Sequence, residues 1–137
     1  MTHSPFTILM ADDDIEDLEF VEIAIAKLNP KAGLYKVTNG KAALDYLINQ
    51  PDNKLPCLII LDYNMPELTG SEVLSLICKY KRFENIPKVI LSTSSTPTHI
   101  QEYMNNGATE YLVKPNNMSG FTDVARKMLG YCKNNAS

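Results

Sequence analysis

The fold is decided by residues 57–72, which read CLIILDYNMPELTGSE. Residues 57–61 form a continuous apolar run that ends at Asp62. A run of this length and composition predicts a strand buried on both faces, as in a parallel sheet. Thr69 and Glu72 have the spacing of a capping box, so we expect a helix to begin directly after Thr69. The stretch therefore predicts a strand, a polar turn and a helix in succession.

The same strand-then-helix unit recurs along the chain. Four further short apolar runs predict strands at residues 6–11, 34–37, 88–91 and 110–113. Apolar residues at helical spacing follow each of them, and Thr96-Pro97 predicts the start of the fourth helix with Thr96 as its cap. Because parallel strands need long crossover connections, the five units predict an α/β fold: a doubly wound, five-stranded parallel sheet with helices on both faces.

Length and composition agree with one such domain over residues 1–137, with a core at about 6–133 and a frayed tail at 134–137. The formal net charge is −3, and two arginines are too few for a nucleic-acid-binding face. No apolar run approaches the ~20 residues of a membrane span, and residues 1–5 lack the features of a signal peptide. We therefore expect a cytoplasmic protein with neither nucleic acid nor membrane as a partner.

The chain contains three cysteines, Cys57, Cys78 and Cys132. Their odd number and the lack of a C-x-x-C pair predict separate thiols rather than a disulfide framework or a metal site. Separate thiols are typical of a reducing compartment.

Polar residues stand where four of the five predicted strands end. They are Asp12-Asp13-Asp14, Asp62, Ser92-Thr93 and Lys114-Pro115. The carboxyl ends of parallel strands lie at one edge of the sheet, where α/β folds bind their ligands. Taken singly, each residue has an ordinary structural role, such as a helix cap for Asp14 or a surface cation for Lys114. Together, the carboxylates, the hydroxyl and the ammonium group indicate a functional site.

Three of these carboxylates predict a metal ion. Asp12, Asp13 and Asp62 would crowd negative charge, which either raises a pKa or requires a cation. Mg²⁺ suits best, because it binds through one or two carboxylates and keeps open positions for a phosphate. With Lys114 and a hydroxyl at the same edge, it would clamp a phosphoryl group, and a carboxylate in that clamp can act as the nucleophile.

These residues give the chain a resemblance to the receiver domains of two-component response regulators. It extends over about residues 7–129 and rests on the following features: Asp12-Asp13, the D-x-x-M-P-x-x-x-G run at 62–70, Ser92, Lys114-Pro115, and Tyr111 three residues before the lysine. The resemblance implies a flavodoxin-like (βα)5 fold with strand order 2-1-3-4-5. Residues 86–94 and 107–115 look most like single-domain receivers that are paired with phytochrome kinases.

The resemblance also implies a role for each acidic residue. Asp62 would accept a phosphoryl group from a sensor histidine kinase or a histidine phosphotransfer protein. Asp13, Asp62 and the backbone carbonyl of Asn64 would bind Mg²⁺ directly, with Asp12 acting through water. The chain would then be a phosphoacceptor in a signalling relay rather than an enzyme with a separate substrate.

The remaining site residues would read out the phosphoryl group. In the family, the hydroxyl at Ser92 and the amine of Lys114 pair with phosphoryl oxygens, and the Lys114–Pro115 peptide bond is usually cis. Two departures are that Ser92 stands where threonine is commoner, and Thr93 where alanine is frequent. Ser92 would move inward on phosphorylation and Tyr111 would follow as the switch residue.

The resemblance implies a particular output surface. We expect it on the face made by the helix at 97–106, the strand at Tyr111 and the last helix. Its partner would be a downstream protein that the sequence does not name, and family members commonly form a homodimer through the same face.

Three other classes of protein fit the sequence less well. A phosphohydrolase of the haloacid dehalogenase type needs threonine or valine where Glu16 stands, a second acidic pair after the lysine, and a cap domain. A degenerate receiver, which acts without phosphorylation, usually lacks one of the acids or the lysine, and all are filled here. A flavodoxin-like electron carrier needs a hydroxyl-rich phosphate loop where this chain has Asp12-Asp13-Asp14.

Overall fold

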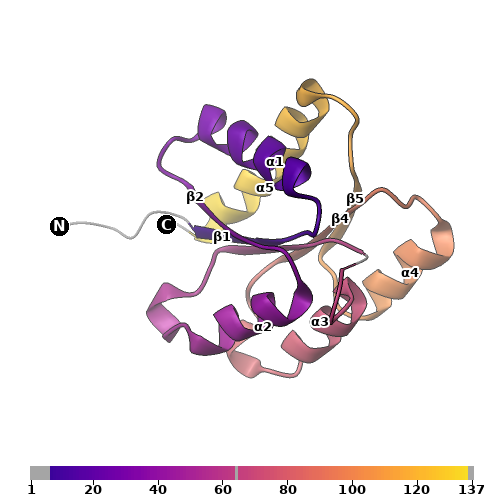
Figure 1. Cartoon of the computed structure of the whole chain (residues 1–137). Coiled ribbons are helices and arrows are strands. Elements are labelled where there is room, and N and C mark those ends of the chain that lie inside the picture. Colours follow the sequence, from indigo (N-terminus) through magenta and orange to yellow (C-terminus); the bar gives the residue numbers. More distant parts are fainter. Residues whose placement is uncertain (1–6, 64, 136–137) are drawn as a thin grey trace.

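The computed structural model of the chain describes residues 7–63 and 65–135. It contains one parallel sheet in the order β2-β1-β3-β4-β5, which confirms the predicted topology (Figure 1). The strands are β1 (Thr7–Ala11), β2 (Gly33–Val37), β3 (Leu58–Leu61), β4 (Lys88–Ser92) and β5 (Glu110–Val113). Phe6, which the sequence placed in the first strand, lies outside the described residues.

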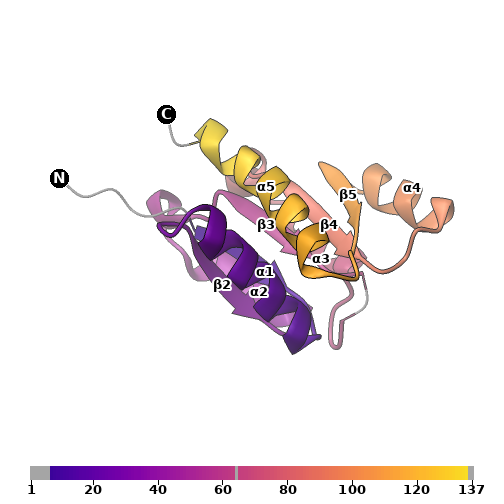
Figure 2. The same cartoon turned by 90° about the horizontal axis from the view of Figure 1, so that it is seen from above.

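Helices cover both faces of the sheet. Helices α1 (Ile15–Leu28) and α5 (Met118–Asn135) pack side by side on one face, as Figure 2 shows from above. Helices α2 (Gly40–Asn49), α3 (Gly70–Ile77) and α4 (Pro97–Asn105) lie on the other face (Figure 1). Among the described residues, no helix combines the length and the apolar composition that a membrane span requires.

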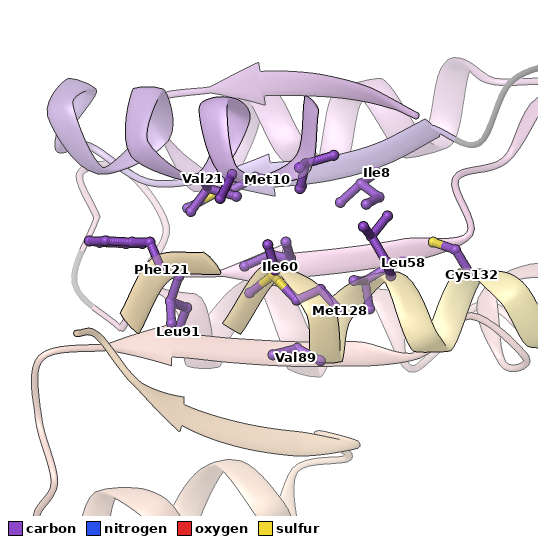
Figure 3. Packing of buried hydrophobic residues seen from close by; sticks show 14 of the residues in the cluster. Ile8, Met10, Val21, Leu58, Ile60, Val89, Leu91, Phe121, Met128 and Cys132 are labelled. Carbon is purple, nitrogen blue, oxygen red and sulfur yellow. The ribbon is translucent and has the colours of Figure 1, made fainter. Parts of the chain in front are cut away.

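Alternating strand residues build two separate cores. Ile8 and Ile60 point toward α1 and α5, in a cluster whose packing Figure 3 shows from close by. Their neighbours Leu9 and Ile59 point toward the cluster under α2, α3 and α4. All four side chains are completely buried. The central strands therefore support both cores, and this explains why their sequences are apolar without alternation.

Local capping signals were predicted with mixed success. Thr69 and Glu72 form the expected capping box at the start of α3, and Asp14 caps α1. Pro97 occupies the first turn of α4, but within the described residues Thr96 makes no side-chain capping bond. Thr96 is the cap residue of α4 by position, as predicted, and its own backbone N–H donates to the Ser94 hydroxyl at 3.3 Å. The position of this cap is therefore confirmed, but its expected side-chain bond is not found.

The last helix runs further than expected. Helix α5 continues to Asn135, so residues 134 and 135 extend the helix instead of starting a frayed tail. Residues 136 and 137 lie outside the described part of the chain.

Two of the three cysteines are not separate thiols. Cys57, directly before β3, forms a disulfide with Cys132 of α5, with the two Cα atoms 5.2 Å apart. Cys78 is a free thiol, as predicted for all three, and it is exposed. The pairing was missed because the two residues are 75 positions apart, and no local spacing reports a contact of that range.

Candidate phosphoryl-acceptor and metal site

The sheet places three aspartates together at the carboxyl ends of its two central strands. β1 and β3 are neighbours with Ala11 opposite Leu61, so Asp12 and Asp62 leave the sheet side by side. Carboxylate oxygens of Asp12, Asp13 and Asp62 lie within 4.8 Å of one another. Asp12 and Asp62 are buried and Asp13 is exposed. The cluster thus has two fixed carboxylates and one that faces solvent.

Backbone contacts fix the loops that carry these acids. The N–H of Asp14 donates to a carboxylate oxygen of Asp12 at 2.9 Å, which orients that side chain. After β3, Gly70 packs against the backbone carbonyl of Asp62 so closely that a Cβ atom there would lie 2.1 Å from its oxygen. Within the connecting loop, Glu67 has a φ of 72°, a left-handed conformation that is uncommon outside glycine.

Lys114 is the cation that holds the cluster together. Its Nζ atom lies 2.8 Å from Asp12, 2.8 Å from Asp17 and 3.4 Å from Asp62, and its side chain is only 7% exposed. Asp17, in the first turn of α1, was missed among the site residues because it follows the strand end by a whole helical turn. The signal that could have found it is its place in the run of seven acids between residues 12 and 22.

Burial and neighbouring charges raise the pKa values of three groups of the site. Burial raises the pKa of Asp62 to about 6, the charge of Asp12 adds to the increase, and Lys114 opposes it. Burial also raises the pKa of Asp12 against the lowering effect of its hydrogen bonds. Burial alone would lower the pKa of Lys114, but its bonds to Asp12 and Asp17 raise it instead. One ammonium group therefore does not neutralise the cluster, which favours an additional cation.

A cleft of about 550 Å³ opens beside these groups. The residues that line it include Asp13, Asp62, Ser92, Thr93 and Lys114. Ser92 is 2% exposed and its hydroxyl accepts the N–H of Ser94 at 3.1 Å, whereas Thr93 is exposed. The structure therefore brings the predicted hydroxyls and the lysine to the same cleft as the acids.

Tyr111 reaches this region through a hydrogen-bonded network. Its hydroxyl donates to the backbone carbonyl of Ser94 at 2.8 Å, and its ring is half-buried. The Ser94 hydroxyl lies 2.8 Å from Nδ1 of His99, and Nε2 of His99 lies 3.0 Å from the hydroxyl of Tyr63. Tyr63 directly follows Asp62. The network thus joins the residue after the predicted phosphoacceptor to Tyr111, and His99 was not among the predicted site residues.

One predicted feature of the site is not found, and another falls on a residue outside the described part of the chain. No cis peptide bond occurs among the described residues, so the Lys114–Pro115 bond is not cis as the resemblance implied. The trans form is the intrinsically preferred one, and it is compatible with a Lys114 N–H that donates to the carbonyl of Ser92 at 2.7 Å. Asn64, the predicted source of a metal-binding carbonyl, lies outside the described residues.

Comparison with known proteins identifies the family of the chain. The profile of the response regulator receiver domain matches residues 8–126, and the chain belongs to this family. A probable methanogenesis regulatory protein of Methanothrix harundinacea, FilR2, is 34% identical over 89% of this chain and 78% of its own length. The two-component response regulator ORR7 of rice, Oryza sativa subsp. japonica, is 33% identical over 88% of this chain. This chain spans only 56% of ORR7.

Solved structures share the fold of this chain. The phosphorylated cyanobacterial phytochrome response regulator RcpA superimposes with a TM-score of 0.86 at 26% identity, over 97% of both chains. The Mn²⁺-bound form of response regulator Rcp1 gives a TM-score of 0.82 at 25% identity, over 97% of this chain and 98% of that one. The structures that this chain resembles therefore include a phytochrome-linked regulator, as its sequence predicted.

Proposed function

We propose that the chain accepts a phosphoryl group on Asp62 from a sensor histidine kinase or a histidine phosphotransfer protein, in a Mg²⁺-dependent step. The observation that carries this proposal is the convergence of three carboxylates and one ammonium group on a single open cleft. Receiver domains in general take phosphoryl groups from such donors, and a relative of this fold was crystallised in a phosphorylated form. The chain would act as a phosphoacceptor, with no separate substrate.

Each residue of the site has a separate role in the proposed phosphoryl transfer. A carboxylate oxygen of Asp62 attacks phosphorus as the bond to the donor nitrogen breaks, which gives an acyl phosphate. Lys114 is proposed to pair with one phosphoryl oxygen, and the hydroxyl of Ser92 is proposed to take a second one. Asp12, Asp13 and Asp62 fit a hard cation, because all their ligand atoms are carboxylate oxygens. Bound Mg²⁺ would supply charge neutralisation for the phosphoryl oxygens.

The output surface is proposed to be the face of α4, β5 and α5. The network from Tyr63 through His99 and Ser94 to Tyr111 supports this, since it links the loop after Asp62 to β5 and α4. A change in the position of Ser92 would act on Ser94 two residues later. The downstream partner would read this change by protein contact, and a homodimer on the same face is a further proposal. The expected cytoplasmic location stays a prediction.

Labelling with a small phosphodonor tests the acceptor. Acetyl phosphate with Mg²⁺ is expected to add one phosphoryl group to the chain, detected by intact mass, and Asp62→Asn is expected to remove the addition. Asp14→Asn is a matched control, because Asp14 lines the same cleft but caps α1, and asparagine caps equally well. Labelling of Asp62→Asn at the rate of the parent chain would show that another residue is the acceptor.

A further inference from the structure

A disulfide lies at the end of the sheet opposite the aspartates. Cys57 stands directly before β3, whereas Asp62 stands directly after it, so the two lie at opposite ends of one strand. Cys57 is bonded to Cys132, which sits in α5 at one end of the cluster that includes Ile8 and Leu58 (Figure 3). The proposed phosphoryl chemistry uses neither sulfur.

We propose that Cys57 and Cys132 form a reversible redox site that exchanges with small thiols and disulfides of the glutathione type, through attack at the sulfur of Cys57. The proposal of reversibility rests on the partial exposure of Cys57, because disulfides that solvent can reach are the labile ones that small thiols reduce.

The burial of the two residues differs, and this selects the sulfur that is attacked. Cys132 is completely buried among apolar side chains, whereas Cys57 is half-buried at the start of its strand. An incoming thiolate must reach a disulfide sulfur to displace the other one. Only the Cys57 side offers such access, so the mixed disulfide is expected on Cys57 and Cys132 is the leaving group.

The exchange balances in two steps. A glutathione thiolate attacks Sγ of Cys57, the bond between the two protein sulfurs breaks, and Cys132 leaves as a thiolate that takes a proton from water. A second glutathione thiolate then attacks the glutathione sulfur of the mixed disulfide. This step releases glutathione disulfide and frees Cys57. In the reverse direction, glutathione disulfide accepts two electrons from the two protein thiols and becomes two glutathione molecules.

Oxidation would tether α5 to the start of β3. Helix α5 has other attachments, since Tyr131 and Lys127 both bind the carboxylate of Glu110 in β5. The reduced chain should therefore stay folded but lose a link that closes a loop of 75 residues. A link of this span is expected to raise the melting temperature by about 5–15 °C. The distance of the link from Asp62 along β3 predicts equal labelling by acetyl phosphate in both redox forms.

Thiol counting in the unmodified chain tests the site. The chain is equilibrated with glutathione mixtures from fully oxidised to fully reduced, quenched in acid, denatured and alkylated with iodoacetamide. Intact mass should show one glutathione, on Cys78, and no alkyl group at the oxidised end, and three alkyl groups at the reduced end, with the melting temperature falling alongside. An alkyl group or a second glutathione at the oxidised end would overturn the disulfide. A single alkyl group at the reduced end would overturn its reversibility, and an unchanged melting temperature would overturn the tether.

Single-cysteine variants test the point of attack. In a Cys78→Ser background, Cys132→Ser leaves Cys57 alone, and Cys57→Ser leaves Cys132 alone. With glutathione disulfide under native conditions, the Cys57 chain should gain one glutathione at least about 10-fold faster than the Cys132 chain, because only its thiol is accessible. Equal rates would refute attack at Cys57. Cys78→Ser alone is the matched control and should retain the full change in melting temperature. None of these readouts depends on phosphorylation of Asp62.

Discussion

Asp13 is the residue of the acidic cluster that can be changed with the least damage to the fold. Asp12 and Asp62 are buried and contact Lys114, so their removal would leave a buried ammonium with fewer partners. Asp13 is exposed and its carboxylate faces the cleft. A substitution at Asp13 therefore separates metal binding from folding.

Asp13→Ala is expected to weaken Mg²⁺ binding by at least about 10–100-fold, because it removes one of three converging carboxylates. Titration calorimetry with Mg²⁺ measures the change, and urea unfolding checks that stability is retained. Asp14→Asn again serves as the comparison. If Asp13→Ala binds Mg²⁺ as tightly as the parent chain, the metal site has been assigned to the wrong residues.

The single residues of the site were predictable to different degrees. Asp12, Asp62 and Lys114 follow strand ends directly, and the position of a strand end is visible in the sequence. The contact of Asp17 with Lys114 depends on the rotation of α1 about its axis and on the path of the Lys114 side chain. Neither of these has a signature in the sequence. His99 joins the site only because α4 places it between Tyr63 and Ser94.

At the scale of elements, the first residue of α3 packs directly against the loop that carries Asp62. Gly70 is the first residue of α3 and is buried against the carbonyl of Asp62. Gly130 in α5 has open space within 4 Å of the position a Cβ would take. A side chain at Gly70 would therefore collide with the backbone of Asp62, whereas a side chain at Gly130 would have room.

Gly70→Ala is expected to destabilise the chain by about 2 kcal/mol or more and to slow labelling by acetyl phosphate, because the backbone at Asp62 must move. Gly130→Ala is expected to stabilise it by about 0.5–1 kcal/mol, since alanine has the better helix propensity. Urea unfolding and labelling of both variants provide the measurement. Normal labelling in Gly70→Ala would mean that the loop tolerates the displacement.

β5 and α5 are joined by an acid whose charge is stabilised in the folded state. The hydroxyl of Tyr131 donates to Glu110 at 2.5 Å, and Lys127 lies 3.0 Å away. The bond to Tyr131 is the main cause that lowers the pKa of Glu110 in the folded chain. The stabilisation is therefore present above the unfolded value of about 4.5 and is lost as the pH falls through the lower folded pKa.

Tyr131→Phe is expected to lower the free energy of unfolding by about 1–2 kcal/mol at pH 7, and by less as the pH falls below about 4.5. Urea unfolding at several pH values measures the difference from the parent chain. Tyr80→Phe is the control, because this tyrosine is exposed and its hydroxyl makes no hydrogen bond within the described part of the chain. A difference that does not depend on pH would exclude Glu110 as its source.

Local elements were also predictable only where a short-range pattern decides them. The capping box at Thr69 and the cap at Asp14 depend on residues within one turn, and both were predicted. The position of the α4 cap at Thr96 was also predicted, but within the described residues its hydroxyl makes no capping bond. The disulfide between Cys57 and Cys132 depends on how α5 docks, which no local pattern contains.

At the scale of the whole molecule, one sheet separates two cores that must unfold together. Ile59 and Ile60 are neighbours on β3 and both are completely buried, but they belong to different cores. Each strand residue is held in place by the residues beside it. Loss of packing on one face therefore weakens the sheet that supports the other face.

Ile59→Ala and Ile60→Ala are each expected to lower the free energy of unfolding by about 2–5 kcal/mol, since each leaves a cavity in a close-packed core. Both variants should unfold in one transition with an unchanged denaturant slope. Circular dichroism and tyrosine fluorescence, followed in the same urea series, give the test. Separate transitions for the two signals would show that the cores are independent.

The exposed Cys78 allows a fluorescent dye to be attached to the chain without mutation. With Cys57 and Cys132 joined, it is the sole thiol among the described residues open to a maleimide dye. Its sulfur follows the end of α3 and lies 3.6 Å from the backbone oxygen of Asn106, just past the end of α4. A dye attached there would stand between the two helices, so its brightness would report shifts of α4 in real time.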